Sequence, residues 1–81
     1  MQIKIYSTPT CPYCHLAKEF LKAMNVEFED VDVSQDEAAA QEMIEKSGQM
    51  GVPVIDIDGE IIVGFNRAEL ERILKEKGLL K

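Results

Sequence analysis

Long apolar runs, clusters of basic residues and internal repeats are all missing from this sequence, and each absence excludes a class of protein. The longest apolar stretches span only a few residues, far short of the roughly 20 that a membrane-spanning helix needs. The opening MQIKIYST lacks the apolar segment of a signal peptide. We therefore expect a cytoplasmic protein that neither spans nor binds a membrane.

Positive charge is scarce as well. The chain carries 9 Lys and Arg against 15 Asp and Glu, which gives a formal net charge of -6. No run of basic side chains is available to follow a phosphate backbone. We expect no nucleic-acid partner, and the acidic residues are typical of a solubilising surface.

Cysteine is limited to two residues, Cys11 and Cys14. Two cysteines cannot build the disulfide framework of a small secreted domain, and in a reducing compartment a close pair indicates redox or metal chemistry. A structural zinc site needs four ligands, and His15 is the one further strong candidate nearby. The ligand count therefore favours redox chemistry, and we predict no metal site.

The length and composition of the chain suit one compact domain. With 81 residues, of which 46% are hydrophobic and 30% charged, the chain has room for one core and no deep cleft. We predict a single domain over residues 1–81, monomeric, with its chemistry near the surface.

Hydrophobic periodicity and turn signals predict seven elements. The first four are a strand over 2–6, a helix from Pro12 to near Asn25, a strand over 26–33 with a bulge at 29–30, and a helix capped by Ser34 and Glu37 and ended by Gly48. The last three are strands over 52–57 and 60–63 around an Asp58-Gly59 turn, and a helix between an Asn66 cap and Gly78.

This order, β-α-β-α-β-β-α, predicts an α/β fold. A right-handed parallel crossover followed by a hairpin gives one mixed four-stranded sheet, flanked by three helices.

The segment Cys11-Pro12-Tyr13-Cys14 places two thiols at the start of a helix, directly after the first strand. Unpaired N–H groups and the partial positive charge of the helix N-terminus stabilise a thiolate there. Cys11 lies at the very start of the helix, beside these N–H groups, so we predict that it is the nucleophile. Cys14 lies one turn deeper and is predicted to be the resolving thiol.

Two other interpretations concern these positions. The cysteines could be small buried hydrophobic residues without a redox role, although such residues seldom occupy a strand-to-helix junction in this motif. His15 follows Cys11 by one helical turn, where a charged imidazole would favour the thiolate. The alternative for His15, an ordinary solvated side chain, is the more common one.

The ordered motifs of the chain resemble those of the glutaredoxins and their small-redoxin relatives over nearly its whole length. The segment 6–14 is similar to the family's active-site segment, Gly51-Val52-Pro53 falls where the family has Thr-Val-Pro, and residues 58–64 match its hairpin. The resemblance implies a thioredoxin fold and dithiol–disulfide oxidoreductase activity, with Cys11 and Cys14 as catalytic residues and no bound cofactor.

The resemblance also implies a substrate-binding surface beside the cysteines. It implies a cis Val52–Pro53 bond, whose neighbouring backbone can pair with an extended thiol substrate. Tyr13, which points outward by helix geometry, contributes to the rim. Phe65 is either a partner-facing aromatic, which we favour slightly, or part of the core. The full set of predicted substrate-binding residues is Tyr13, Val52, Pro53, Gly64, Phe65 and Asn66.

Two departures from the family bear on the electron donor. Members that use glutathione typically have Gly-Gly and an acidic residue where this chain has residues 63–67, VGFNR. Thr8 stands where many members have a lysine, whose cation would hold a carboxylate. Gly64-Phe65 is instead similar to redoxins that take electrons from thioredoxin reductase and pass them to enzymes such as ribonucleotide reductase. Glutathione and thioredoxin reductase both remain candidate reductants, and disulfide-containing proteins are the predicted substrates.

The alternative from another class is an iron–sulfur carrier, in which Cys11 from each of two chains and glutathione hold a cluster. Pro12, which stiffens the loop around the thiolate, and the missing glutathione features argue against that assembly.

Overall fold

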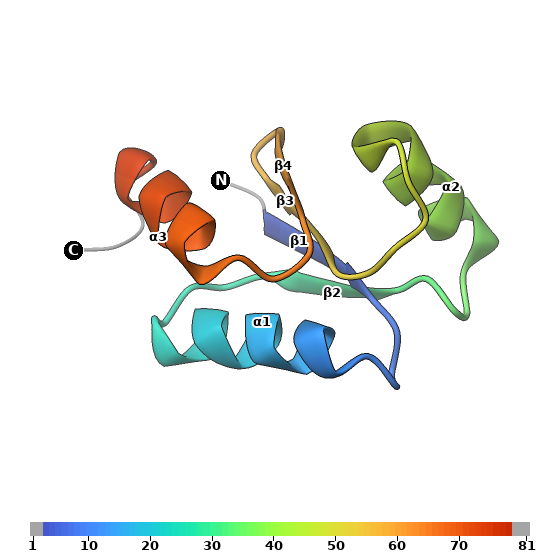
Figure 1. Cartoon of the computed structure of the whole chain (residues 1–81), viewed down its shortest axis with the longest axis horizontal. Coiled ribbons are helices and arrows are strands. Elements are labelled where there is room, and N and C mark those ends of the chain that lie inside the picture. The colour runs from blue at the N-terminus through green and yellow to red at the C-terminus, as the bar shows by residue number, and fades with distance from the viewer. Residues whose placement is uncertain (1–2, 79–81) are drawn as a thin grey trace.

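The computed structural model describes residues 3–78 and contains the seven predicted elements in the predicted order. They are β1 (Ile3–Ser7), α1 (Pro12–Ala23), β2 (Glu29–Asp32), α2 (Glu37–Ser47), β3 (Val54–Ile57), β4 (Glu60–Val63) and α3 (Arg67–Glu76) (Figure 1). The predicted α/β thioredoxin fold is confirmed. Gln2, the predicted first strand residue, lies outside the described residues.

The four strands form one mixed sheet in the order β2-β1-β3-β4. β1 runs parallel to β2 and antiparallel to β3, and β3 runs antiparallel to β4. The strands at the centre of the sheet, β1 and β3, are therefore paired on both sides. Every helix within residues 3–78 is too short or too polar to cross a bilayer.

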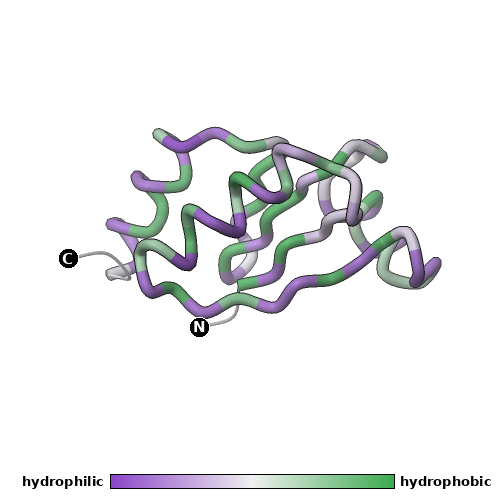
Figure 2. Tube along the Cα trace, turned by 90° about the horizontal axis from the view of Figure 1, so that it is seen from below, coloured by the Kyte–Doolittle hydropathy of each residue, from purple (hydrophilic) through white to green (hydrophobic). Residues whose placement is uncertain are grey.

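Helices cover both faces of the sheet unequally. The larger core lies between the sheet and the pair α1 and α3, and the smaller core lies between the sheet and α2. Alternation along the central strands assigns side chains to these cores: Ile3 and Ile5 enter the larger, whereas Tyr6 enters the smaller. Figure 2 shows the hydrophobic residues of the inner strands enclosed by helices whose outer turns are hydrophilic.

The predicted strand over 26–33 is shorter in the structure and has no bulge. β2 covers only Glu29–Asp32, and its pairing with β1 runs without interruption. Val26 instead belongs to the turn that follows α1, where its N–H donates to the Leu21 carbonyl (2.9 Å). The polar residue that breaks the apolar alternation is Asp30, which is exposed on the edge strand and pairs with Lys18 of α1 (2.9 Å).

The predicted N-cap of α2 is also wrong. Asp36, and not Ser34, caps the helix: its carboxylate accepts the Ala39 N–H at 3.1 Å. Ser34 belongs to the turn before the helix, where its N–H and hydroxyl both donate to Asp32 Oδ1. The predicted end at Gly48 is confirmed, with φ of 75°.

The remaining turn and cap predictions hold. Asp58 and Gly59 both have positive φ, 49° and 98°, as a tight hairpin turn requires. Asn66 caps α3 by accepting the Glu69 N–H (3.2 Å). The strand predicted to begin at residue 52 begins at Val54 instead.

Candidate functional site

The two cysteines meet at the junction between β1 and α1. Cys11 is the N-cap of α1, in an extended conformation with φ of -89° and ψ of 113°. Its Sγ accepts the backbone N–H of Cys14 at 3.2 Å, so the sulfur performs the role that a serine or aspartate oxygen usually has. Pro12 occupies the first turn without leaving an N–H unpaired. This places an acceptor sulfur at the positive end of the helix.

Exposure distinguishes the two sulfur-bearing residues. Cys11 is partly exposed, whereas Cys14 is 1% exposed, and both are free thiols. Burial, reinforced by a hydrogen bond with Cys11, raises the pKa of Cys14 to about 11. Cys14 is therefore protonated at neutral pH, and Cys11 is the thiol that a substrate can reach.

A charged group that we did not predict lies next to Cys14. Lys18 follows Cys14 by one turn of α1, and its ammonium lowers the pKa of Cys14 against the effect of burial. That ammonium is 2.9 Å from Asp30 Oδ2, and the other carboxylate oxygen accepts the hydroxyl of Ser7 at 2.8 Å. Burial raises the pKa of Asp30, but these two hydrogen bonds outweigh it and the net shift is downward. The i, i+4 spacing of Cys14 and Lys18 was the one available signal in the sequence.

A segment distant in sequence completes the site. The Val52–Pro53 peptide bond is cis, and the carbonyl oxygen of Val52 lies 3.8 Å from Cys11 Sγ, which donates a long hydrogen bond to it. The Pro53 carbonyl accepts the Gly64 N–H at 2.7 Å. Three of the predicted residues, Val52, Pro53 and Gly64, are thus linked to one another and to Cys11. Figure 1 shows the segments before β3 and after β4 passing close to each other.

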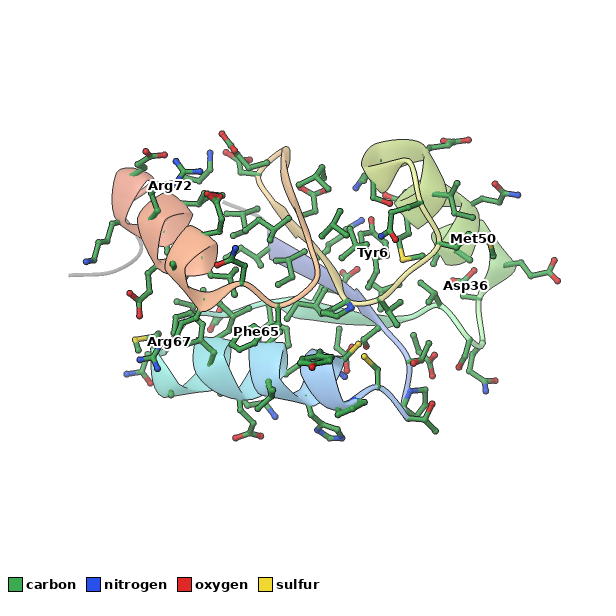
Figure 3. The ribbon with its side chains drawn as sticks, viewed as in Figure 1. Tyr6, Asp36, Met50, Phe65, Arg67 and Arg72 are labelled. Carbon is green, nitrogen blue, oxygen red and sulfur yellow. The ribbon has the colours of Figure 1, made fainter. Side chains whose placement is uncertain are left out.

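The other predicted residues lie in different surroundings. Tyr13 is exposed (61%), as predicted, and His15 is also exposed. Phe65 is half-buried between α3 and α1 (Figure 3), with its ring edge-on to Phe20 at a centroid distance of 6.2 Å. Packing of that kind favours the core alternative for Phe65 over the partner-facing one.

Asn66 also has a structural task. Its side-chain oxygen accepts the Glu69 N–H and so caps α3, while the side chain remains exposed to solvent. The substrate-binding role of Asn66 stays a prediction.

Metal ligands do not gather around the cysteines. Within the described part of the chain, no group of three or more His, Cys, Asp or Glu side chains has a geometry that could hold a metal ion. The site presents two thiols, one partly exposed at the N-terminus of α1 and one buried, with Lys18 one helical turn further along.

Comparisons with known proteins agree with this arrangement. Residues 3–62 match the sequence profile of the glutaredoxin family. The chain is 55% identical over 74 residues to a glutaredoxin-like 8.6 kDa protein of the rubredoxin operon of Clostridium pasteurianum, covering 91% of this chain and 99% of that one. It is 42% identical over 62 residues to glutaredoxin 3 of Escherichia coli, covering 76% and 75% of the two chains.

A solved structure shares the fold. The glutaredoxin-like NrdH-redoxin of Escherichia coli, described as having a thioredoxin-like activity profile, superposes with a TM-score of 0.81 at 26% identity. The match covers 90% of this chain and 95% of that one.

Proposed function

Because the chain belongs to the glutaredoxin family, whose members are generally thiol–disulfide oxidoreductases, we propose that it reduces disulfides of proteins or small molecules through the Cys11/Cys14 dithiol. One observation carries the proposal: Cys11 Sγ accepts the Cys14 N–H at the start of α1, while the Cys14 thiol is buried one turn below. A negative charge on Cys11 is stabilised by that N–H and by the helix N-terminus.

The reaction has two exchange steps. The Cys11 thiolate attacks one sulfur of the substrate disulfide, forms a mixed disulfide and releases the first substrate thiolate. Cys14 then gives up its proton to the first substrate thiolate or to water and attacks Cys11 Sγ, forming the Cys11–Cys14 disulfide and releasing the second thiolate. The substrate gains two electrons and the protein loses two, which a reductant must return.

The order of the steps follows from the surroundings of Cys14. Burial is the largest cause of its raised pKa, and Cys11 adds two further contributions, a hydrogen bond and charge repulsion. Both depend on the Cys11 thiol or thiolate, so they disappear once Cys11 is bound in the mixed disulfide. The lowering effect of Lys18 remains. Burial, the largest cause of the raised pKa, remains in the mixed disulfide, so only the smaller contributions of Cys11 are relieved when Cys14 attacks.

Replacement of each cysteine separately tests the roles. We expect Cys11→Ser to abolish reduction of a disulfide-linked peptide, because the attacking sulfur is gone. Cys14→Ser keeps the first step and accumulates a mixed disulfide at Cys11, which mass spectrometry of the intact protein detects. Equal residual turnover in the two variants, or a mixed disulfide at residue 14, would contradict the assignment.

For the electron donor, we propose thioredoxin reductase rather than glutathione. Support comes from the residues 63–67, which lack the Gly-Gly-acidic sequence, from Thr8 in place of a lysine, and from the likeness to a redoxin with a thioredoxin-like activity profile. Ribonucleotide reductase is then a candidate client. We propose that the chain acts in the cytoplasm, as a monomer with a single domain.

A coupled assay decides between the donors. The oxidised protein is offered NADPH with thioredoxin reductase in one reaction, and NADPH, glutathione and glutathione reductase in another. Reduction in the second reaction alone would reject the reductase-fed proposal. The iron–sulfur alternative has its own test, since a brown dimer from anaerobic purification would support it.

A further inference from the structure

In the segment between α2 and the cis-proline, the side chain of Gln49 binds the backbone of Gly51. The carboxamide nitrogen of Gln49 donates to the Gly51 carbonyl at 3.0 Å, and its oxygen accepts the Gly51 N–H at 2.8 Å. One side chain thus satisfies both hydrogen-bonding groups of Gly51, a residue that belongs to no strand. The carboxamide thus makes the two hydrogen bonds that a neighbouring strand would make if Gly51 lay in a sheet.

Gln49 is itself fixed to the end of α2. The hydroxyl of Ser47 lies 2.9 Å from the Gln49 carbonyl oxygen and 2.7 Å from that of Met43, and it also accepts the Gln49 N–H at 3.3 Å. Gly48 ends the helix in the left-handed conformation. The base of the Gln49 side chain is therefore anchored to α2, and its tip is anchored to Gly51.

The residue at position 51 must be small for this arrangement. A Cβ placed on Gly51 would lie 2.7 Å from Gln49 Oε1, closer than side chains approach one another. Gly51 has no positive φ that would require glycine for backbone reasons. The space around position 51 is thus taken by the Gln49 carboxamide.

The residue immediately after Gly51 faces the nucleophile. Val52 presents its carbonyl oxygen to Cys11 Sγ, and Pro53 is tied to Gly64 on the far side. Between the end of α2 and Pro53, Ser47 holds the backbone of Gln49 and Val52 packs against the smaller core, while the two Gln49–Gly51 bonds hold the exposed Gly51 between them. Met50, which is 78% exposed beside α2, packs too little to do so (Figure 3).

We propose that Gln49 is a positioning residue, whose carboxamide holds Gly51 so that the backbone of Val52 stands ready beside Cys11 to receive an extended peptide disulfide. The inference rests on the proposed exchange function. A peptide substrate that pairs with the Val52 backbone gains from its preorganisation, because the cost of ordering the segment has been met before binding. A small disulfide without peptide groups makes no such pairing and gains nothing.

The test is a single-turnover measurement with reduced protein, in which no reductant enzyme is needed. A short peptide dimer joined by one cystine and bis(2-hydroxyethyl) disulfide serve as the two substrates, and formation of the Cys11–Cys14 disulfide is followed by mass spectrometry. For Gln49→Ala we expect a loss of about tenfold in the second-order rate with the peptide, as two neutral hydrogen bonds are removed. The rate with the non-peptide disulfide stays within about twofold of the parent protein.

A second variant and a control complete the experiment. Gly51→Ala displaces the carboxamide, so it should reproduce the peptide-selective loss, and Gln49→Ala combined with Gly51→Ala should be no worse than Gly51→Ala alone. Gln41→Ala removes the same side chain from an exposed position of α2 and should leave both rates unchanged.

Three outcomes would overturn the positioning role. They are equal losses with both substrates, a peptide rate unchanged in Gln49→Ala, and additive effects in the double variant. Failure of the exchange function is a separate result, because the parent protein would then oxidise with neither substrate.

Discussion

The two thiols lie three residues apart, but their positions in α1 give them different exposure and hydrogen bonding. Cys11, as N-cap, accepts a backbone N–H and remains within reach of solvent, whereas Cys14 is enclosed on the α1 face of the sheet. The enclosure favours the neutral form, so the pKa of Cys14 is raised to about 11. A group that is neutral when buried links redox chemistry to stability, because ionising it weakens the folded state.

That linkage predicts an alkaline loss of stability. Since the folded pKa of Cys14 exceeds that of a free cysteine, its contribution is complete below about pH 8.5 and is lost as the pH rises towards 11. We expect the free energy of unfolding of the reduced protein to fall by on the order of 2 kcal/mol more across this range than that of Cys14→Ala. Urea unfolding under reducing conditions measures both.

The Cys14→Ala protein serves as the reference because other groups also titrate in this range. Burial raises the pKa of Tyr6, and this contribution is present in both proteins, so it cancels in the difference. Identical pH dependence in the two proteins would mean that Cys14 is not held neutral by the fold.

The cysteine pair could be predicted from sequence, whereas the groups around it could not. A motif at a strand-to-helix junction defines Cys11 and Cys14 from local information alone. Lys18 lies in α1 and Asp30 in β2, and they meet only because β2 pairs with β1. No local sequence pattern predicts that contact. The ring of hydrogen bonds between Gln49 and Gly51 depends likewise on the path of a loop.

At the scale of the element, helix starts were predicted where the sequence offered one good cap and missed where it offered two. Asn66 was the evident choice for α3, and it is the cap. Before α2 both Ser34 and Asp36 are suitable, and the Ser34–Glu37 spacing matched the capping box. The structure uses Asp36 because Ser34 is already engaged by Asp32.

The two caps can be compared directly. We expect Asp36→Ala to lower the free energy of unfolding by about 1 kcal/mol, since it leaves the Ala39 N–H without its acceptor. Ser34→Ala should change it by less than about 0.5 kcal/mol, because the hydroxyl it removes is exposed. Asp36→Asn, which keeps a capping oxygen, should restore most of the loss. A larger effect at Ser34 than at Asp36 in urea unfolding would reinstate the capping box.

At the scale of the whole molecule, the sheet is held unequally on its two faces. Among residues 3–78, the core under α1 and α3 has a dozen buried residues, and the core under α2 has three. Alternation along the strands predicts that two faces exist, but the lengths and contacts of the helices decide how much each one buries. The weaker apolar contact under α2 is supplemented by charge.

Lys46, in the last turn of α2, provides that charge. Its ammonium donates to Asp56 Oδ2 at 2.6 Å and to the Tyr6 hydroxyl at 2.9 Å, and it lies 3.0 Å from Glu42. The contacts with Asp56 and Tyr6 raise the pKa of Lys46, so the ammonium remains charged well into the alkaline range. One side chain of α2 thereby joins both central strands, because Tyr6 lies in β1 and Asp56 in β3. Figure 3 shows Tyr6 on the side of the sheet that faces α2.

Removal of this ammonium should release α2 before the rest of the molecule. In Lys46→Met the carboxylate of Asp56, which is 9% exposed, loses its charged partner and keeps the Gly59 N–H, and we expect a loss of about 1 to 3 kcal/mol in the free energy of unfolding. Hydrogen exchange should accelerate most for the amides of α2, while those of β1 and α1 respond only to the global change. Lys75→Met, at an exposed position of α3, provides the matched control and should leave α2 protected. If the amides of α1 accelerated as much as those of α2, the two faces would open together, and the unequal cores would not set the order in which the molecule comes apart.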